Sequence, residues 1–440
     1  MKFFFPDSQD QIAPDFDFLA ERHSPHRLRQ LDDHYAHEAL AAPAYDGVLV
    51  SKTIVDGFSG TAKYSDAQRR QLHRLNVRGF FRLDHPGRPS LEAMGDCGAF
   101  TYRDLATPPY TVDEVLDFYE QYGFDYGVSV DHVILCPLQP DRASVVPDEF
   151  TARQALTLEL AADFLRGHRA RNATFTPLGV AQGWSPGSYA GAVAALQRMG
   201  YQHVAVGGMV PLKTRDILKC LAAIDTVRDP ATQLHLLGIT RCDHVEAFAG
   251  YGVSSFDSTS PFRQAFKDDS DNYYTLQRPY TALRVPQLQG NTKLNQAIAA
   301  GAIDQRAARN AERHCLDLLR RFERGEVPVD DVLEALATYE TIYQPSRSRI
   351  DAYRETLEAA PWRSCTCGIC APLGVQVAIF RGAERNKRRG FHNLAIFRRQ
   401  LVGRLATLAR PVQPATAWPS AAQPASGHDR AVCLTKTSRG

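Results

Sequence analysis

The sequence predicts an α/β fold: a (β/α)8 barrel of the TIM type, with a helical insertion and a C-terminal structural zinc subdomain. Two observations support this prediction. From Val48 onward, short apolar runs alternate with longer segments of helical periodicity, which is typical of parallel strands connected by helices. Three closely spaced cysteines and a histidine follow near the C-terminal end, in the pattern of a metal site.

Eight apolar segments are candidate strands of the barrel. They are 47–55, 93–98, 127–135, 176–181, 204–206, 235–239, 253–256 and 280–285. The segments between them include helical patterns at 112–122, 152–167, 188–200 and 214–223. A doubly wound parallel sheet is the main alternative, because its strands and helices alternate along the chain in the same way.

Composition divides the chain into five regions. They are an N-terminal arm (1–45), the barrel (46–290), a helical insertion (291–345), the zinc subdomain (346–410) and a tail (411–440). The zinc subdomain ends in a basic helix, because 381–410 carries eight arginines and one lysine against one acid. The tail is rich in Pro, Ala and Ser, so we expect it to be disordered.

The most informative single motif is Cys365-x-Cys367-x-x-Cys370, followed by His392. Three thiolates and one imidazole are a closed tetrahedral ligand set for a structural Zn²⁺ ion, with no position left for a substrate. The short loop supplies three ligands and His392 returns from a separate segment, so the ion would connect two parts of the chain. We therefore predict a structural zinc site here and expect the chemistry elsewhere.

Charge and cysteine usage narrow the functional class. The formal net charge is only +2 over 440 residues, so any nucleic-acid-binding surface has to be local. Six of the nine cysteines are scattered outside the zinc motif, which fits a reducing compartment better than a disulfide framework. The three-Phe run near the N-terminus is too short for a signal peptide, and no stretch approaches a membrane span. We expect a cytoplasmic protein with no membrane partner.

Three carboxylates, Asp96, Asp131 and Asp257, end or interrupt predicted strands, where a parallel barrel places its working residues. A buried carboxylate costs desolvation energy unless it is paired or used in chemistry. Any one of them alone is equally typical of a helix N-cap or a salt bridge. Cys97, beside Asp96, is a less favoured candidate for a thiol nucleophile.

Two glycine-containing turns carry candidate ligand-binding groups. Gln182 lies just past the apolar segment 176–181, and its amide can both donate and accept hydrogen bonds in a base-like pattern. Gly207 and Gly208 would let bare backbone approach a planar ligand closely. Each turn is also typical of an ordinary tight connection between a strand and a helix.

The ordered set of motifs resembles the guanine transglycosylases, zinc-bearing (β/α)8 barrels that exchange guanine in a nucleic acid for a 7-deazaguanine. The matching pieces are Gly-Asp-Cys-Gly-Ala-Phe at 95–100, Gly-Val-Ala-Gln-Gly at 179–183, Gly-Gly at 207–208, Ser-Phe-Asp at 255–257, and the zinc motif with His392. The resemblance implies that Asp257 is the nucleophile and Asp96 the general acid and base. It also implies that Asp131, Gln182, Gly207 and Gly208 bind the base, and that the basic segment 381–410 contributes to a phosphate-binding surface.

The chain departs from the transfer-RNA members of that family after Asp257. Those enzymes usually continue with a Cys-Val-x-Pro-Thr-Arg stretch that contacts RNA, whereas here the residues are Ser258-Thr-Ser-Pro-Phe-Arg-Gln-Ala-Phe266. The pattern is more similar to the DNA-directed branch, which inserts 7-cyano-7-deazaguanine into bacterial DNA beside partner proteins of a restriction-type system. The resemblance thus implies a DNA guanine transglycosylase. A divergent tRNA-guanine transglycosylase and a catalytically silent nucleic-acid-binding subunit are the alternatives.

Overall fold

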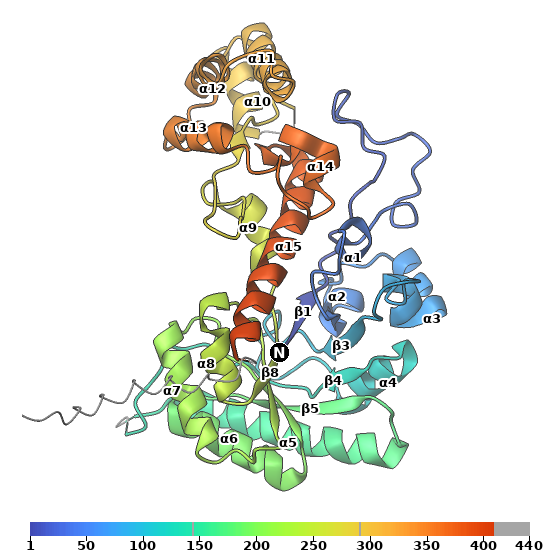
Figure 1. Ribbon diagram of the computed structural model, residues 1–440. Coiled ribbons are helices and arrows are strands. Elements are labelled where there is room, and N and C mark those ends of the chain that lie inside the picture. Colours follow the sequence, from blue (N-terminus) through green and yellow to red (C-terminus); the bar gives the residue numbers. More distant parts are fainter. Residues whose placement is uncertain (143–144, 290–291, 409–440) are drawn as a thin grey trace, which may run out of the picture.

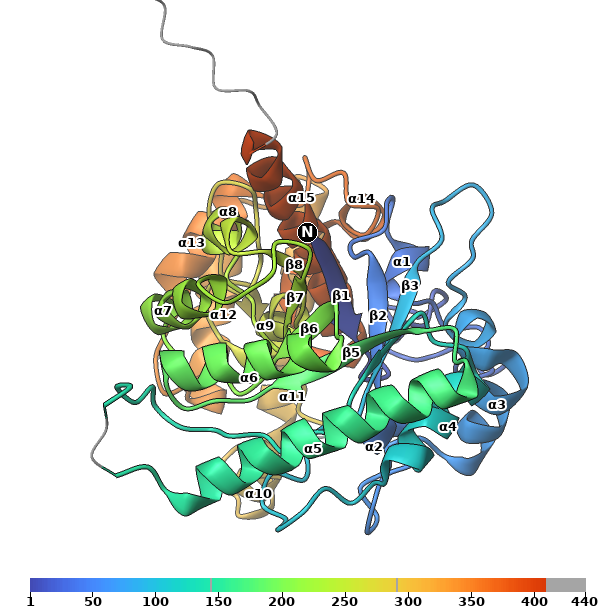
Figure 2. The ribbon, with the colours of Figure 1, turned by 90° about the horizontal axis from the view of Figure 1, so that it is seen from below.

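Eight parallel strands form a closed barrel in the computed structural model, which describes residues 1–142, 145–289 and 292–408 (Figures 1 and 2). The strands are β1 (Lys2–Pro6), β2 (Gly47–Ser51), β3 (Glu92–Asp96), β4 (Tyr126–Val128), β5 (Thr176–Ala181), β6 (His203–Val206), β7 (Gln233–Leu236) and β8 (Val253–Asp257). Neighbours in the chain pair with each other, and β1 closes the ring by pairing with β8. The predicted barrel is confirmed. The doubly wound alternative is excluded, because an open sheet would leave two strands with a free edge.

The first barrel strand comes from the N-terminal segment, and here the sequence prediction was wrong. β1 pairs with β2 at Phe4↔Gly47 and with β8 at Phe3↔Phe256, so the barrel begins at residue 2 and not at residue 46. Phe4 belongs to the cluster inside the barrel, whereas Phe3 and Phe5 belong to the main core outside it. Because both faces of β1 are buried, the strand has no apolar–polar alternation that would reveal it.

The segment predicted as the last strand, 280–285, does not belong to the barrel. Only β9 (Leu283–Arg284) is extended, and it pairs with β10 (Ile379–Phe380) in a separate two-stranded sheet. The run is apolar because Leu283 and Val285 are fully buried in the main core. The apolar character of this segment therefore predicted its burial correctly, but it could not predict which strand the segment pairs with.

Helices cover the outside of the barrel and connect its strands. They are α2 (Lys52–Val55), α3 (Asp66–Phe81), α4 (Val112–Tyr122), α5 (Asp148–Arg171), α6 (Pro186–Met199), α7 (Thr214–Asp225), η1 (Cys242–His244) and α8 (Val245–Gly250), with α1 (Ala36–Ala39) in the arm and α9 (Ser260–Lys267) after β8. Ser65 and Thr111 cap α3 and α4 by accepting the N–H group of the third helical residue. The four predicted helical segments correspond to α4, α5, α6 and α7.

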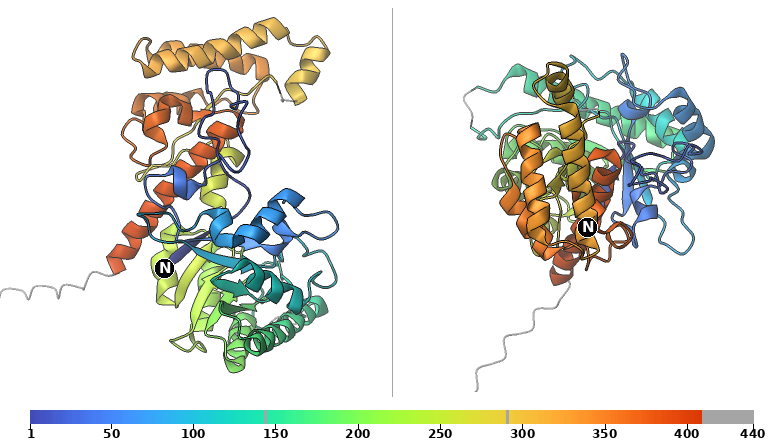
Figure 3. Two further views of the ribbon diagram at one scale, coloured as in Figure 1. Left: turned by 90° about the vertical axis from the view of Figure 1, so that its right-hand side faces the viewer. Right: turned by 90° about the horizontal axis from the view of Figure 1, so that it is seen from above.

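The C-terminal part of the chain forms a second layer above the barrel in Figure 1. It contains α10 (Thr292–Ala299), α11 (Gln305–Glu323), α12 (Val329–Tyr343), α13 (Ile350–Ala359), α14 (Cys370–Leu373), η2 (Gly374–Ala378) and α15 (Gly382–Leu408). The predicted insertion at 291–345 thus holds three helices within its described residues. Helix α15, orange-red in Figure 3, runs from this layer down along the barrel.

Within the described residues, no helix combines the length and the apolar character needed to cross a lipid bilayer. The tail at 411–440, which the sequence predicts to be disordered, lies outside the residues that the structure describes.

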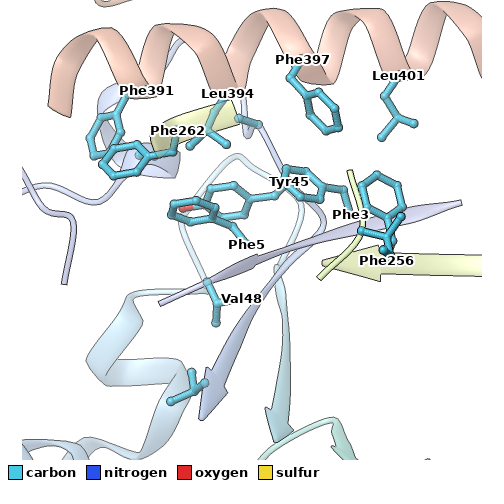
Figure 4. Packing of buried hydrophobic residues seen from close by; sticks show 14 of the residues in the cluster. Phe3, Phe5, Tyr45, Val48, Phe256, Phe262, Phe391, Leu394, Phe397 and Leu401 are labelled. Carbon is cyan, nitrogen blue, oxygen red and sulfur yellow. The ribbon is translucent and has the colours of Figure 1, made fainter. Parts of the chain in front are cut away.

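Aromatic packing fixes α15 to the barrel (Figure 4). The ring of Phe397 lies edge-on to that of Phe3, with centroids 5.0 Å apart, and Phe3 stacks on Phe256 at 5.2 Å. Farther along α15, Phe391 contacts Phe262 of α9 at 5.9 Å. All five rings are buried, and each burial contributes about 2 kcal/mol relative to an exposed ring. Because Phe3 and Phe256 lie on β1 and β8, α15 covers the seam where the barrel closes.

Four of the seven described arginines in the basic segment 381–410 are buried, so the predicted phosphate-binding role of this segment is wrong for them. Arg389 is fully buried and donates hydrogen bonds to the carbonyl oxygens of Ala265 and Ile379. Arg388 pairs with Glu384 one turn earlier. The remaining ion pairs are Arg381 with Glu21 and Glu312, Arg385 with Glu21, Arg398 with Asp46, and Arg404 with Asp243. A guanidinium group held inside the protein cannot contact a nucleic-acid backbone.

Glu21 anchors the N-terminal arm to α15. Its Oε1 atom lies 2.7 Å from Nε of Arg381 and 2.7 Å from Nη1 of Arg385. Burial by itself raises the pKa of Glu21, but hydrogen bonds and charge from Arg381 and Arg385 outweigh it and lower that pKa to about 2. The Phe18 ring packs against the guanidinium of Arg385, at 5.1 Å. The arm is therefore attached to the rest of the molecule through a charge cluster at its middle.

Replacing Glu21 with glutamine is expected to destabilise the folded protein by about 3 kcal/mol, because Arg385 stays buried after its carboxylate partner is lost. Chemical denaturation followed by circular dichroism measures the change. Asp15→Asn is the matched control, since Asp15 is an exposed acid of the same arm. Equal stability of the two variants would contradict the anchoring role of Glu21.

Candidate active site

A cavity of about 450 Å³ opens at the carboxyl ends of the barrel strands. Every residue that the sequence analysis assigned to catalysis or base binding lines it. These residues are Asp96, Asp131, Gln182, Gly207, Gly208 and Asp257. They come from five different strands or the turns that follow them, and the closed barrel brings those strand ends together at one rim.

Asp96 is the last residue of β3, and its register partner is Ser51 of β2. The Oδ1 atom of Asp96 is buried and has no hydrogen-bond partner among the described residues. Burial raises the pKa of this carboxyl group to about 6, and the negative charge of Asp257 adds to the rise. Hydrogen bonds from Ser51 and Gly98 act in the opposite direction. Asp96 can therefore hold or release a proton near neutral pH.

Asp257 is the last residue of β8, and two groups from the β7 side hold it. The N–H group of Gly238 donates to its Oδ1 atom at 2.9 Å, and Nε2 of His235 lies 3.2 Å from the same oxygen. In the tautomer that donates from Nε2 to this oxygen, Nε2 carries the proton. Nδ1 of His235 then accepts from the Ser255 hydroxyl, 2.8 Å away. Both contacts involve Oδ1, so Oδ2 of Asp257 stays available for chemistry.

The sequence analysis missed His235. This histidine is almost fully buried and lies in the middle of β7, in a run that the sequence marked only as an apolar strand. A polar residue inside such a strand was the available signal. The contact of His235 with Asp257 depends on β7 lying beside β8, which could not be read from the residues around His235.

Asp131 and Gln182 form a polar pair on the wall of the cavity. The Nε2 atom of Gln182 donates to Oδ2 of Asp131 at 2.8 Å, and its Oε1 atom accepts the N–H group of Ile134 at 3.2 Å. Burial raises the pKa of Asp131 to about 7, although the hydrogen bond from Gln182 opposes this rise. The pair thus presents one acceptor-rich and one donor-bearing side chain, fixed in orientation.

Gly207 and Gly208 are required by the close approach of their backbone to Gln182. A Cβ atom at Gly207 would lie 2.3 Å from Nε2 of Gln182, and one at Gly208 would lie 2.5 Å from the carbonyl oxygen of Ile134. Gly208 also has a φ of +73°, a conformation that other residues rarely adopt. Both glycines therefore keep the amide of Gln182 in place as well as lining the cavity.

Phe100, Lys63 and Arg263 line the rim of the cavity, and Arg103 lies beside Phe100. The Phe100 side chain is 57% exposed, and the Arg103 guanidinium lies 4.7 Å from its ring centroid. An exposed aromatic face beside a polar cavity can stack on a flat ligand. Lys63 and Arg263 are also exposed there and contribute positive charge. The sequence analysis assigned no role to these four side chains.

Cys97 does not take part in this site. Its side chain is buried behind β3, with Sγ 3.9 Å from the Tyr119 hydroxyl, and it does not line the cavity. Burial raises the pKa of the thiol well above its usual range. The geometry therefore excludes the thiol-nucleophile alternative for this cavity.

The predicted metal ligands come together in the C-terminal layer. The ligand atoms of Cys365, Cys367, Cys370 and His392 all lie within 4.8 Å of one another. Nδ1 of His392 is 3.4 Å from Sγ of Cys365 and 3.3 Å from Sγ of Cys370. Its Nε2 atom lies 2.7 Å from the carbonyl oxygen of Tyr274, which can only accept, so Nε2 carries the proton and Nδ1 is free to bind a metal ion. This group can hold one metal ion.

Comparison with known proteins identifies the family. A DNA-guanine transglycosylase from Salmonella montevideo is 46% identical to this chain over 409 residues, which cover 91% of this chain and 96% of that enzyme. The chain belongs to the guanine transglycosylase family. Within the family it lies in the branch that the Salmonella enzyme represents, and its class is that of a base-exchanging pentosyltransferase. No protein-family model matches the chain.

The cavity of this transglycosylase separates two kinds of carboxylate. Burial raises the pKa of Asp96 and that of Asp131 toward neutrality. Asp257 instead accepts hydrogen bonds from Gly238 and His235. One cavity therefore holds carboxylates in two different kinds of surroundings.

Asp131→Asn is expected to stabilise the folded protein at pH 8, by up to about 4 kcal/mol. The pKa of Asp131 is about 7 in the folded state, against an ordinary value of 3.8, so the folded state loses stability as pH rises from 4 to 7. Asparagine removes that loss, and the difference between the two proteins disappears below about pH 4. Thermal and denaturant unfolding measured at both pH values would show it, with Glu159→Gln as an exposed-acid control. A variant less stable than wild type at pH 8 would contradict this account of Asp131.

Proposed function

We propose that this transglycosylase exchanges guanine in DNA for 7-cyano-7-deazaguanine, through a covalent intermediate on Asp257. The observation that carries the proposal is that Asp96 and Asp257 line one cavity in contrasting surroundings. A volume of about 450 Å³ is typical of sites that enclose a small molecule. The DNA substrate is supported by the name and the 46% identity of the Salmonella relative.

The reaction proceeds as two displacements at one sugar carbon. In the first, a carboxylate oxygen of Asp257 bonds to C1′ of the target nucleotide while the bond from C1′ to N9 of guanine breaks, and Asp96 gives its proton to the leaving base. In the second, the Asp96 carboxylate takes the N9 proton of 7-cyano-7-deazaguanine, and N9 displaces Asp257 from C1′. Asp96 ends protonated as it began, and two inversions give overall retention.

His235 acts as a positioning residue in this mechanism. Its bond to Oδ1 of Asp257, together with that of Gly238, orients the carboxylate and directs Oδ2 toward the cavity. The Ser255 hydroxyl fixes the tautomer of His235 from the other side. A nucleophile held in this way needs little reorganisation before it attacks.

The base is recognised through its hydrogen-bonding edge and its flat face. The N1–H and N2–H groups of guanine donate to the Asp131 carboxylate, and Nε2 of Gln182 donates to O6. The exposed ring of Phe100 stacks on the base from the rim. A base inside a duplex cannot reach such a cavity, so the target nucleotide leaves its stack first. Partner proteins, which the family resemblance implies, would assist at this step.

The metal group is a structural zinc site in this proposal. In tetrahedral zinc complexes, bond lengths of about 2.3 Å to sulfur and 2.0 Å to nitrogen separate ligand atoms by about 3.5–3.8 Å. The distances from Nδ1 of His392 to Cys365 and Cys370, and the 3.6 Å between the sulfurs of Cys367 and Cys370, are compatible with that geometry. The ion would connect the 365–370 loop to α15, and no position is left for a substrate.

Purified protein is expected to contain one zinc ion per chain by elemental analysis, and Cys367→Ser to lose both the metal and much of the folding stability. Cys242→Ser is the control, because this free cysteine lies outside the ligand group. A wild-type protein without zinc, or a Cys367 variant that keeps it, would contradict the assignment.

The decisive experiment supplies labelled guanine with single-stranded DNA, duplex DNA or tRNA, and measures label in each polymer. Wild type is expected to label DNA and to form a covalent DNA adduct that survives denaturation. Asp257→Asn should lower exchange by about a thousandfold or more and abolish the adduct. Asp331→Asn, an exposed acid of α12, serves as the control. Label in tRNA alone would overturn the DNA assignment, and exchange by Asp257→Asn would overturn the double displacement.

A further inference from the structure

Helix α11 of the insertion carries a row of arginines that the protein does not neutralise. Arg306, Arg309 and Arg313 are exposed, and none forms an ion pair with another residue in the described part of the chain. Their spacing of three and four residues places them on one face of the helix. The opposite face, which includes Ala308 and Cys315, is buried. The three guanidinium groups therefore point away from the core.

This placement works against the stability of the helix itself. Arg309 and Arg313 are like charges one turn apart, which repel each other. Arg306 lies in the first turn, where the helix dipole disfavours a cation, and no acidic residue follows the cap in that turn. Near the other end of α11 the pattern is conventional, because Arg324 pairs with Glu326. An external anion would relieve the repulsion that the sequence leaves in place.

Two more exposed cations lie at the same end of the insertion. A small apolar cluster that includes Leu294 of α10 and Ala308 of α11 also packs against Tyr343, the last residue of α12. This packing places α10 and the end of α12 beside the start of α11. Lys293 on α10 and Arg347, four residues beyond α12, are both exposed. The positive charge is thus contributed by three adjoining segments.

The row has defined ends and a length that fits a nucleic-acid backbone. Asp304 precedes it and is engaged as the N-cap, accepting the N–H group of Ala307, and the exposed Asp317 follows one turn after Arg313. From Arg306 to Arg313 the helix rises about 10 Å. This length is comparable with the span of a few successive phosphates along one strand of DNA.

Helix α11 extends toward the side of the molecule where the cavity opens. In Figure 2, β1 points from the N-terminus toward the side on which α10 and α2 lie, and Figure 3 shows α11 extending to that side as well. The carboxyl ends of the parallel strands, with Asp96 and Asp257, face the same way. A polymer with its target base in the cavity can therefore continue past the insertion.

We propose that Arg306, Arg309 and Arg313 bind the phosphate backbone of DNA that flanks the target nucleotide. This inference rests on the proposed function and adds the surface that holds the polymer. Arginine suits the task because its planar fork of donors matches two phosphate oxygens at once. The contact is independent of base sequence, so it supplies affinity and register while the cavity selects guanine.

The test is a triple variant, Arg306→Gln, Arg309→Gln and Arg313→Gln, because glutamine keeps helix propensity and removes the charge. Fluorescence anisotropy with a labelled duplex should show DNA affinity reduced by about tenfold or more, with the slope of log K against log salt smaller by about 3. Exchange at saturating DNA should keep its kcat while KM rises, because none of the three residues lines the cavity. The triple lysine variant should recover most of the affinity.

The control carries the same change of charge on the outer helices of the barrel: Arg166→Gln, Arg198→Gln and Arg215→Gln on α5, α6 and α7, at the opposite end of the molecule in Figure 1. All three are exposed. It should bind and exchange like wild type. Equal losses in both triple variants would show a general charge effect and overturn the proposed surface, and so would wild-type affinity and salt slope in the α11 variant. Thermal unfolding confirms that each variant is folded.

Exchange by the wild-type protein distinguishes failure of the proposed DNA-binding surface from failure of the proposed function on which it rests. If wild type exchanges guanine in DNA and the α11 variant matches it in affinity and KM, only the surface is overturned. If wild type exchanges guanine in tRNA and not in DNA, the proposed function fails, whatever the variant does.

Discussion

The pairing of β1 with both β2 and β8 is the constraint on which the rest of the structure depends. It closes the sheet, and closure turns the carboxyl ends of eight strands into one rim around one cavity. Asp96 on β3 and Asp257 on β8 are far apart in the chain and share that cavity only because the ring is complete. Strand β1 also carries Phe3, which contacts Phe397 of α15. Closure of the barrel therefore also fixes the position of the C-terminal layer, which contains the Cys–His cluster.

The groups that line the cavity reduce the stability of the folded protein. Burial raises the pKa of Asp96 and Asp131 toward neutrality, so each costs folding stability once it is ionised. The backbone around Gln182 allows only glycine at position 207, which removes side-chain packing from the wall. The hydrophobic packing of α15 against β1 and β8 offsets this loss of folding stability at a distance from the cavity. The stabilising contacts of the scaffold thus lie apart from the rim, where the buried carboxylates reduce stability.

Local pattern in the sequence was sufficient for much of the fold and for selecting six residues that line the cavity, whereas their predicted roles came from the family resemblance. Seven of the eight strands, the flanking helices and the three-cysteine motif each depend on residues close together in the chain. The predictions that were wrong or missing concern contacts between residues far apart in the sequence. β1 was missed because both of its faces are buried, and 280–285 was misplaced because an apolar run does not name its partner. His235 was missed because its role exists only through the adjacent strand.

Arginine provides the clearest case, because the same residue type serves two opposite purposes in the C-terminal layer. In the densest basic run of the sequence, 381–410, four of the seven described arginines are buried, and Glu21 from the arm pairs with two of these guanidinium groups. The row of Arg306, Arg309 and Arg313 on α11 is shorter and less dense in the sequence, but these arginines form no ion pair within the described part of the chain. Whether a cation is free depends on which acids folding brings to it. Charge density along a sequence therefore predicts neither a binding surface nor its absence, whereas unneutralised charge on a folded surface indicates where an anion can bind.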